Sequence, residues 1–261
     1  MFSDSHPHDT VEMSVRDVLT ESSNIGTIKL AQMVGKDRFD AYLRAFGFGQ
    51  PTGLGFPGEA NGLVLPLSQY NDTSLASMPI GNGLAVTAMQ MLDVYTTIAN
   101  GGATRPPRLV AATLGKDGTR HDEPMPETRQ VVSPTTSATM RSMLQDVVAN
   151  GTGTQAQIPG YDVAGKTGTA RKPPYDKPPY KYVASFAGFA PASSPRLAAI
   201  VVLDEPQGNY FGGQVAAPAF ARIMEYALRL DRVPPSATQP TPPPAANGNS
   251  AAPAYTLTPS P

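Results

Sequence analysis

Four consecutive residues, Lys166-Thr167-Gly168-Thr169, carry side chains suited to holding an anionic substrate. A lysine supplies positive charge, and two threonine hydroxyls can donate hydrogen bonds to a carboxylate. The glycine leaves room for another backbone to approach a strand. The combination suits an extended peptide that ends in a free carboxylate and binds by strand addition.

The same four residues also fit an ordinary strand end, with threonines chosen for their β-propensity. From average residue usage, Lys-Thr-Gly should arise by chance in about one chain in twenty of this length. The tetrapeptide alone therefore does not establish a site.

A second cluster of short polar side chains, Ser22-Ser23-Asn24, lies near the start of a helical pattern. Serine and asparagine are preferred at helix N-termini, so simple capping explains the cluster. A Ser-x-Asn triplet is expected roughly once in a chain of this length. Its value depends on what accompanies it.

Two further segments have a functional and a plain interpretation. His6-Pro7-His8, with Asp4 and Asp9, resembles a metal site, but two histidines two apart lack a fixed tetrahedral set, so we expect no metal. The tandem Lys-Pro-Pro-Tyr of residues 172–181 could be a polyproline ligand for a partner. We favour a stiff hairpin loop beside the site.

Composition excludes several classes of protein. The 261 residues, 40% hydrophobic and 16% charged, suffice for one large domain or two small ones. A net charge of -1 gives no electrostatic footprint for nucleic acid. The absence of cysteine excludes disulfides and thiolate metal sites. The longest apolar run, Leu197–Leu203, is far shorter than the roughly 18 to 20 residues that span a bilayer.

Hydrophobic periodicity predicts helices first and strands later. Spacings of three and four residues predict helical structure in five stretches: 15–19, 25–33, 39–46, Thr87–Ala99 and Pro134–Val148, the last capped by Ser133. Period-two or continuous apolar patterns predict strands at Tyr161–Ala170, Val183–Ala190 and Leu197–Asp204, and a helix at Ala216–Leu230.

This order indicates an α+β fold in which an antiparallel sheet is flanked by helices. The tetrapeptide lies late in the first strand, and the third strand has the nearly continuous apolar run of a buried sheet position. We assign residues 1–232 to one partial domain. Residues 233–261 form a proline-rich tail that we expect to be disordered, because residues 234–261 hold nine prolines and no charge.

Together and in this order, the two motifs resemble those of penicillin-binding proteins and serine β-lactamases, which carry Ser-x-x-Lys, Ser-x-Asn and Lys-Thr-Gly. Over residues 2 to 230 the chain resembles the penicillin-binding transpeptidase domain, especially its class B, division-type members. Five segments look like family segments in family order: Ser22–Gly26, Met78–Gly83, Val163–Ala170, Phe186–Pro191 and Gly212–Phe220.

The chain departs from the family in one respect. The family's acylated serine and its general-base lysine lie in a Ser-x-x-Lys motif upstream of Ser-x-Asn, and no lysine here has a serine three residues before it. The chain also begins without an element before its first helical pattern. We therefore expect a fold that is incomplete at its N-terminus, a truncated chain, and no turnover by the chain alone.

The resemblance implies a role for each matching residue. Ser22 would hydrogen-bond the missing lysine and shuttle a proton, and Asn24 would hold the substrate amide. Lys166 would supply positive potential. Thr167 and Thr169 would bind the terminal carboxylate, with the Thr169 N–H forming half of the oxyanion hole. Gly168 would permit close approach of the substrate strand.

The implied reaction is transfer of a peptidoglycan stem peptide from D-Ala-D-Ala to an amine on a neighbouring stem, with β-lactams binding in the same place and no cofactor. The family further implies cell-division partners and a membrane-anchored parent protein on the extracytoplasmic face. Two alternatives remain open. One is a catalytically silent peptidoglycan-binding or division scaffold, and the other is a D,D-carboxypeptidase or β-lactamase relative.

Overall fold

A computed structural model describes residues 2–4 and 9–236 of the chain. Its centre is a three-stranded antiparallel sheet formed by β5 (Ala164–Arg171), β6 (Tyr182–Ala190) and β7 (Leu197–Asp204) in the order β5-β6-β7. The predicted α+β class and the antiparallel pairing are confirmed. The first strand begins three residues later than predicted, because Tyr161 belongs to a turn bridged to Ile158.

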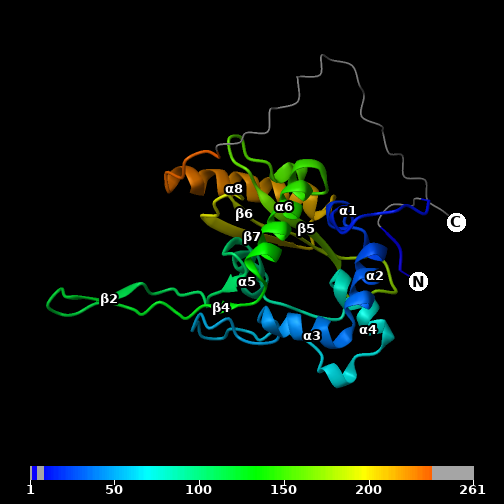
Figure 1. Cartoon of the computed structure of the whole chain (residues 1–261), viewed down its shortest axis with the longest axis horizontal. Coiled ribbons are helices and arrows are strands. Elements are labelled where there is room, and N and C mark those ends of the chain that lie inside the picture. Colours follow the sequence, from blue (N-terminus) through cyan, green and yellow to red (C-terminus); the bar gives the residue numbers. More distant parts are fainter. Residues whose placement is uncertain (1, 5–8, 237–261) are drawn as a thin grey trace, which may run out of the picture.

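Helices cover both faces of this sheet (Figure 1). On one face α8 (Ala217–Leu230) packs Phe220, Met224 and Leu228 against Phe186 of β6. On the other face α5 (Ala88–Ala99) and α6 (Pro134–Asn150) pack against Phe189. Because side chains alternate along a strand, Phe186 and Phe189 belong to opposite faces of β6. The sheet is thus held between two hydrophobic clusters.

The order of the strands corrects one prediction. The apolar third strand, β7, was predicted to be buried in the sheet, but it is an outer strand whose residues are half-buried or exposed, with Val202 45% exposed. The central strand is β6, whose inner positions are mostly alanine, glycine and phenylalanine. Small residues suit β6 because a neighbouring strand lies on each side and helices cover both faces. Apolar content alone did not identify the central strand.

The first third of the chain is helical, as predicted, with breaks between the helices. The helices are α1 (Val15–Thr20), α2 (Asn24–Val34), α3 (Lys36–Ala45) and α4 (Asp72–Ser77), and short 3-10 turns lie at Leu67–Gln69, Met78–Ile80 and Thr154–Ala156. Farther along, Ser133 caps α6 by accepting from the Thr136 N–H, with proline at the first helical position, as predicted.

Two small ribbons were not predicted. One pairs β1 (Ala103–Thr104) with β4 (Arg129–Gln130), and the other pairs β2 (Ala112–Leu114) with β3 (Arg120–Asp122). The β2–β3 hairpin projects away from the body of the molecule (Figure 1). Its strands are too short and too polar to show a period-two pattern.

The described end of the chain is attached to the domain. Val233, predicted as the start of the tail, is only 8% exposed, and the Ser236 N–H donates to the Gly160 carbonyl over 2.9 Å. The rest of the predicted tail, 237–261, lies outside the described residues, as do His6 and His8. None of the helices in the described ranges has the length and apolar character needed to cross a membrane.

Candidate active site

The tetrapeptide Lys166–Thr169 occupies the middle of β5, where it pairs with the run from Ala184 to Ala187 on β6. It was predicted late in the strand, but pairing continues to Arg171 opposite Tyr182. The other edge of β5 pairs with no strand of the described residues. The four residues therefore lie on an open strand edge.

Gly168, the glycine of the tetrapeptide, is packed closely against the neighbouring strand β6. A Cβ atom on Gly168 would lie 2.5 Å from the Ser185 Oγ atom on β6. That distance is far shorter than a van der Waals contact, so a side chain here would displace Ser185. The packing against Ser185 explains why glycine occupies position 168. The predicted role of Gly168 in substrate approach stays a prediction.

Thr152, a residue that the sequence did not single out, places its hydroxyl beside the tetrapeptide. Thr152 follows α6, and its Oγ1 lies 2.9 Å from the Thr167 Oγ1. The Lys166 ammonium donates to the Thr167 Oγ1 over 3.1 Å and to the Thr152 Oγ1 over 3.4 Å. Alternation along β5 places Lys166 and Thr167 on opposite faces, so the lysine side chain bends round to reach these hydroxyls. The result is one charge beside two hydroxyls.

The lysine is held in an unusual environment. Its acceptors, the two threonine hydroxyls and the Thr167 carbonyl, are all neutral oxygen atoms. Burial lowers the pKa of Lys166 to about 8, because enclosure removes water from the ammonium. An anionic ligand would supply the negative charge that this ammonium lacks.

Thr169 connects β5 to the following layer. Its Oγ1 accepts a hydrogen bond of 3.0 Å from the Gly212 N–H at the start of α7 (Gly212–Val215). A Cβ atom on Gly212 would lie 2.3 Å from the carbonyl oxygens of Gly168 and Ser185. Only glycine allows α7 to lie this close to the sheet, and the Thr169 hydroxyl hydrogen stays available to a ligand.

The Ser22-Ser23-Asn24 cluster forms the turn between α1 and α2. Ser23, not Ser22, is the helix cap, and its Oγ accepts from the Gly26 N–H over 2.9 Å. Ser22 has a φ of +59°, a left-handed conformation that costs a non-glycine residue about 1–2 kcal/mol. The capping interpretation thus accounts for Ser23 and leaves the strained Ser22 unexplained.

Residues near the start of the chain lie against this turn. The Asn24 Nδ2 donates to the Ser3 carbonyl over 2.9 Å. The Asp4 carboxylate accepts from the Ser23 hydroxyl and the Ile25 N–H, each over 3.0 Å. A carboxylate at the first turn of α2 is favoured by the helix dipole. These contacts fix the orientation of the Asn24 side chain.

Thr152 links the turn to the strand. Its N–H donates to the Thr20 carbonyl over 3.3 Å, directly before the Ser22–Asn24 turn, while its hydroxyl contacts Thr167. Between Ser22 or Asn24 and β5 no hydrogen bond is formed within the described residues, and Thr152 bonds both to Thr20, just before the turn, and to Thr167 on the strand. A hydroxyl residue between two glycines, Gly151 and Gly153, was the sequence signal that could have identified it.

Aromatic residues surround the far end of β5. The Arg171 guanidinium lies 3.3 Å from the centre of the Tyr180 ring, and its Nε and Nη2 atoms are buried without a hydrogen-bond partner. Tyr182 stacks on Tyr210 at 4.1 Å between ring centres, and Phe211 lies 4.7 Å from Tyr210. Of these five residues, only Tyr180 lies in a segment that the sequence placed beside the site. The β5–β6 connection is the predicted hairpin loop.

A separate cavity of about 260 Å³ lies elsewhere, lined in part by Gln90, Asp93 and Arg129. Burial, helped by the charge of Glu59, raises the pKa of Asp93 to about 6. The cavity shares no lining residue with the two predicted motifs, so it is not the candidate site. The described residues contain no cluster of side chains able to hold a metal ion.

The site can be set beside known proteins. The family model for the penicillin binding protein transpeptidase domain matches residues 3–225. Penicillin-binding protein PbpB of Mycolicibacterium smegmatis is 42% identical over 255 residues, which is 92% of this chain and 39% of that protein. Peptidoglycan D,D-transpeptidase FtsI of Escherichia coli is 39% identical over 229 residues, 87% of this chain and 37% of that protein.

Solved structures agree with the sequence comparisons. Penicillin binding protein 3 of Mycobacterium tuberculosis, complexed with aztreonam, matches with a TM-score of 0.82 and 41% identity over 89% of this chain and 55% of that one. Its complex with ampicillin matches with a TM-score of 0.83. The chain spans well under half the length of the two relatives compared by sequence, PbpB and FtsI.

Proposed function

The chain belongs to the family of penicillin-binding protein transpeptidase domains, in its class B, division-type group, and on that premise we propose that it forms the substrate-binding part of a serine-type peptidoglycan D,D-transpeptidase. The substrate is a stem peptide that ends in D-Ala-D-Ala. One observation carries the proposal: at the open edge of β5, the Lys166 ammonium lies beside the hydroxyls of Thr167 and of Thr152, which follows α6. β-Lactams bind at the same place.

The reaction transfers an acyl group in two steps. A serine attacks the carbonyl between the two D-alanines, the amide C–N bond breaks, and the last D-alanine leaves with a proton on its amine. An amine of a second stem peptide then attacks the acyl-serine ester, and the serine leaves with its proton restored. The acyl group thus passes from one stem to the other.

Each residue of the tetrapeptide Lys166–Thr169 has a part in this reaction. The Lys166 ammonium attracts the terminal carboxylate, and the hydroxyls of Thr167 and Thr169 donate hydrogen bonds to it. The Thr169 N–H contributes one of the donors that stabilise the oxyanion, where each donor is worth about 10²–10³ in rate. Gly168 leaves room for the substrate strand.

The turn between α1 and α2 supplies the other wall. Asn24 orients the substrate amide through its side chain, and Ser22 passes a proton to and from the lysine that accompanies the nucleophile. The left-handed φ of +59° at Ser22 supports this role, because strained residues are concentrated at functional sites.

The nucleophile is not among the 261 residues, since no Ser-x-x-Lys is present. We therefore propose that this chain alone binds its ligands reversibly. The same observation favours a second function, a silent peptidoglycan-binding or division scaffold that binds peptide at the open edge of β5 without chemistry. An in-frame Ser-x-x-Lys within several tens of codons upstream in the genome would favour the enzyme, and its absence would favour the scaffold.

For the longer protein we propose a membrane-anchored position on the extracytoplasmic face and partners among cell-division proteins. Its similarity to FtsI and PbpB supports both. Fluorescence microscopy of the tagged full-length gene product should show accumulation at the division site, whereas uniform cytoplasmic signal would contradict the proposal.

The binding role is tested by titrating the 261-residue chain with an acyl-D-Ala-D-Ala peptide. We expect the backbone NMR signals of Lys166–Thr169 to shift, and the Thr167→Val variant to bind more weakly by about tenfold or more, since one hydrogen bond to a charged group is lost. Thr113→Val on β2 is the matched control. A peptide that ends in an amide should bind poorly, and equal binding of the two peptides would overturn the carboxylate assignment.

A further inference from the structure

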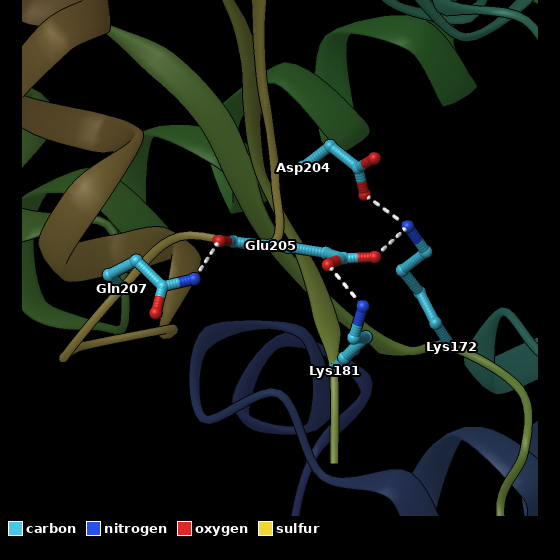
Figure 2. A network of polar contacts seen from close by, with 5 residues as sticks. All are labelled: Lys172, Lys181, Asp204, Glu205 and Gln207. Carbon is cyan, nitrogen blue, oxygen red and sulfur yellow. Dashed lines mark hydrogen bonds and ion pairs between the residues drawn. The ribbon is translucent and has the colours of Figure 1, made fainter. Parts of the chain in front are cut away.

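Two loops flank the carboxyl end of β5, and a network of charges lies at their base (Figure 2). The first loop, 172–181, connects β5 to β6, and the second, 206–211, follows β7. The Lys172 ammonium contacts the carboxylates of Asp204 and Glu205, each over 2.7 Å. The Lys181 ammonium contacts the other oxygen of Glu205, also over 2.7 Å. One glutamate thus binds both ends of the first loop.

The backbone holds Glu205 in place for these contacts. Its φ is +51°, and its N–H donates to the Tyr182 carbonyl over 2.9 Å. Its carbonyl accepts from the Gln207 Nε2 over 3.0 Å. The two lysines are joined as well, because the Lys172 N–H donates to the Lys181 carbonyl over 2.8 Å. A glutamate fixed on both sides holds the two loops in one geometry.

The charges reinforce one another. Hydrogen bonds from Lys172 and then Lys181 lower the pKa of Glu205. Hydrogen bonds to Asp204 and then Glu205 raise the pKa of Lys172. A single exposed ion pair contributes little, but several charges in a shared network contribute more. These ion pairs matter because of the position of the network, at the base of two loops beside β5.

The clamped loops carry groups that touch the candidate site. Tyr180 of the first loop covers Arg171, and Tyr210 of the second loop stacks on Tyr182. The second loop then leads directly into Gly212, whose N–H donates to the Thr169 Oγ1. Displacement of the second loop would therefore alter the surroundings of Thr169, and displacement of the first would uncover Arg171 at the end of the same strand.

We propose that Glu205 is a positioning residue of the candidate site. It clamps Lys172 and Lys181, and so holds the aromatic rings and the Gly212 N–H against the carboxyl end of β5. The clamp is a property of the fold, whereas its effect on peptide binding rests on the proposed function.

Hydrogen exchange on the full 261-residue chain tests the clamp. In Glu205→Gln we expect amides of 172–181 and 206–211 to exchange about threefold faster, which corresponds to the loss of two weak exposed ion pairs, while amides of β6 keep their rates. Glu225→Gln is the matched control, because Glu225 forms an ion pair with Arg229 on α8. Unchanged exchange in both loops would overturn the clamp. If Glu205→Gln does not fold, Lys181→Gln removes one arm and should give the same pattern more weakly.

Peptide binding separates the positioning role from a purely structural one. We expect Glu205→Gln to bind acyl-D-Ala-D-Ala about threefold more weakly, and 1 M salt to abolish the difference, because exposed charges are then screened. Faster loop exchange with unchanged binding would overturn the positioning role and leave the clamp. If the unmodified chain binds no peptide, the proposed function fails, and the exchange result still decides the clamp.

Discussion

The two walls of the candidate site are built in different ways. The strand wall, β5, belongs to a hairpin whose partner β6 follows directly in the sequence and is buried on both faces. The turn wall, Ser22–Asn24, depends on contacts with α6 more than one hundred residues away. Arg16 of α1 pairs there with Asp146, and Thr20 accepts from Thr152. We infer that the strand wall is rigid and the turn wall adjustable.

The largest effect should follow from damage to the strand wall. Phe186 is fully buried, and its ring lies 4.7 Å from that of Phe220. Phe186→Ala should destabilise the chain by about 4 kcal/mol through lost burial and a cavity. Urea unfolding measures this, with Phe56→Ala, at an exposed position, as the control. A cost near that of the control would contradict a rigid sheet.

The next effect comes from the joint between the walls. A Cβ atom on Gly151 would lie 2.4 Å from the Thr20 carbonyl oxygen. Gly151→Ala should cost about 2 kcal/mol and move the turn away from β5, because the backbone must shift. NMR signals of Ser22–Asn24 should change while those of β6 persist, and the neighbouring Asn150→Ala should change neither. Signals of the turn that stay in place would show that Thr152 does not join the walls.

A smaller effect is expected within the turn itself. Ser23→Ala removes the cap of α2 and the hydroxyl that contacts Asp4. We expect a loss of about 1 kcal/mol in unfolding free energy and a changed signal for the Asn24 side-chain amide. Ser133→Ala removes an equivalent cap from α6 and should cost as much without changing that signal. Equal changes in the two variants would mean that the cap does not orient Asn24.

The smallest effect concerns the charge on the strand wall. Because burial lowers the pKa of Lys166 to about 8, its ammonium loses its proton as the pH rises through 8. Binding of a peptide carboxylate should therefore weaken by about threefold between pH 7 and 9. Calorimetric titration measures this affinity. The Lys166→Ala variant should bind the peptide equally at pH 7 and pH 9. Binding that does not change with pH would argue against a role for this charge.

The same contrast explains what could be predicted from the sequence. The strands and their antiparallel order were predictable, because pairing within a hairpin is local and leaves a period-two pattern. Lys166, Thr167 and Thr169 were singled out as candidates because their types suit one ligand, and their role stays a proposal. The start of α6 was predictable as well, because Ser133 is a preferred cap and Pro134 is favoured at the first helical position.

Other features depend on contacts that no local pattern records. Thr152 and Glu205 matter only because the fold brings α6 and the end of β7 to β5. The outer position of β7 could not be derived from its apolar residues, since an outer strand covered by α8 can be as apolar as a central one. The contact between the Arg171 guanidinium and the Tyr180 ring could not be predicted from the sequence either.

The central claim is that this chain holds a substrate wall without its nucleophile, and a labelled penicillin tests it most directly. The 261-residue chain should bind the label reversibly and lose it on denaturation, while the same chain joined to the upstream part of its gene should be labelled at a serine of a Ser-x-x-Lys motif. Labelling of the 261-residue chain that survives denaturation would contradict the account.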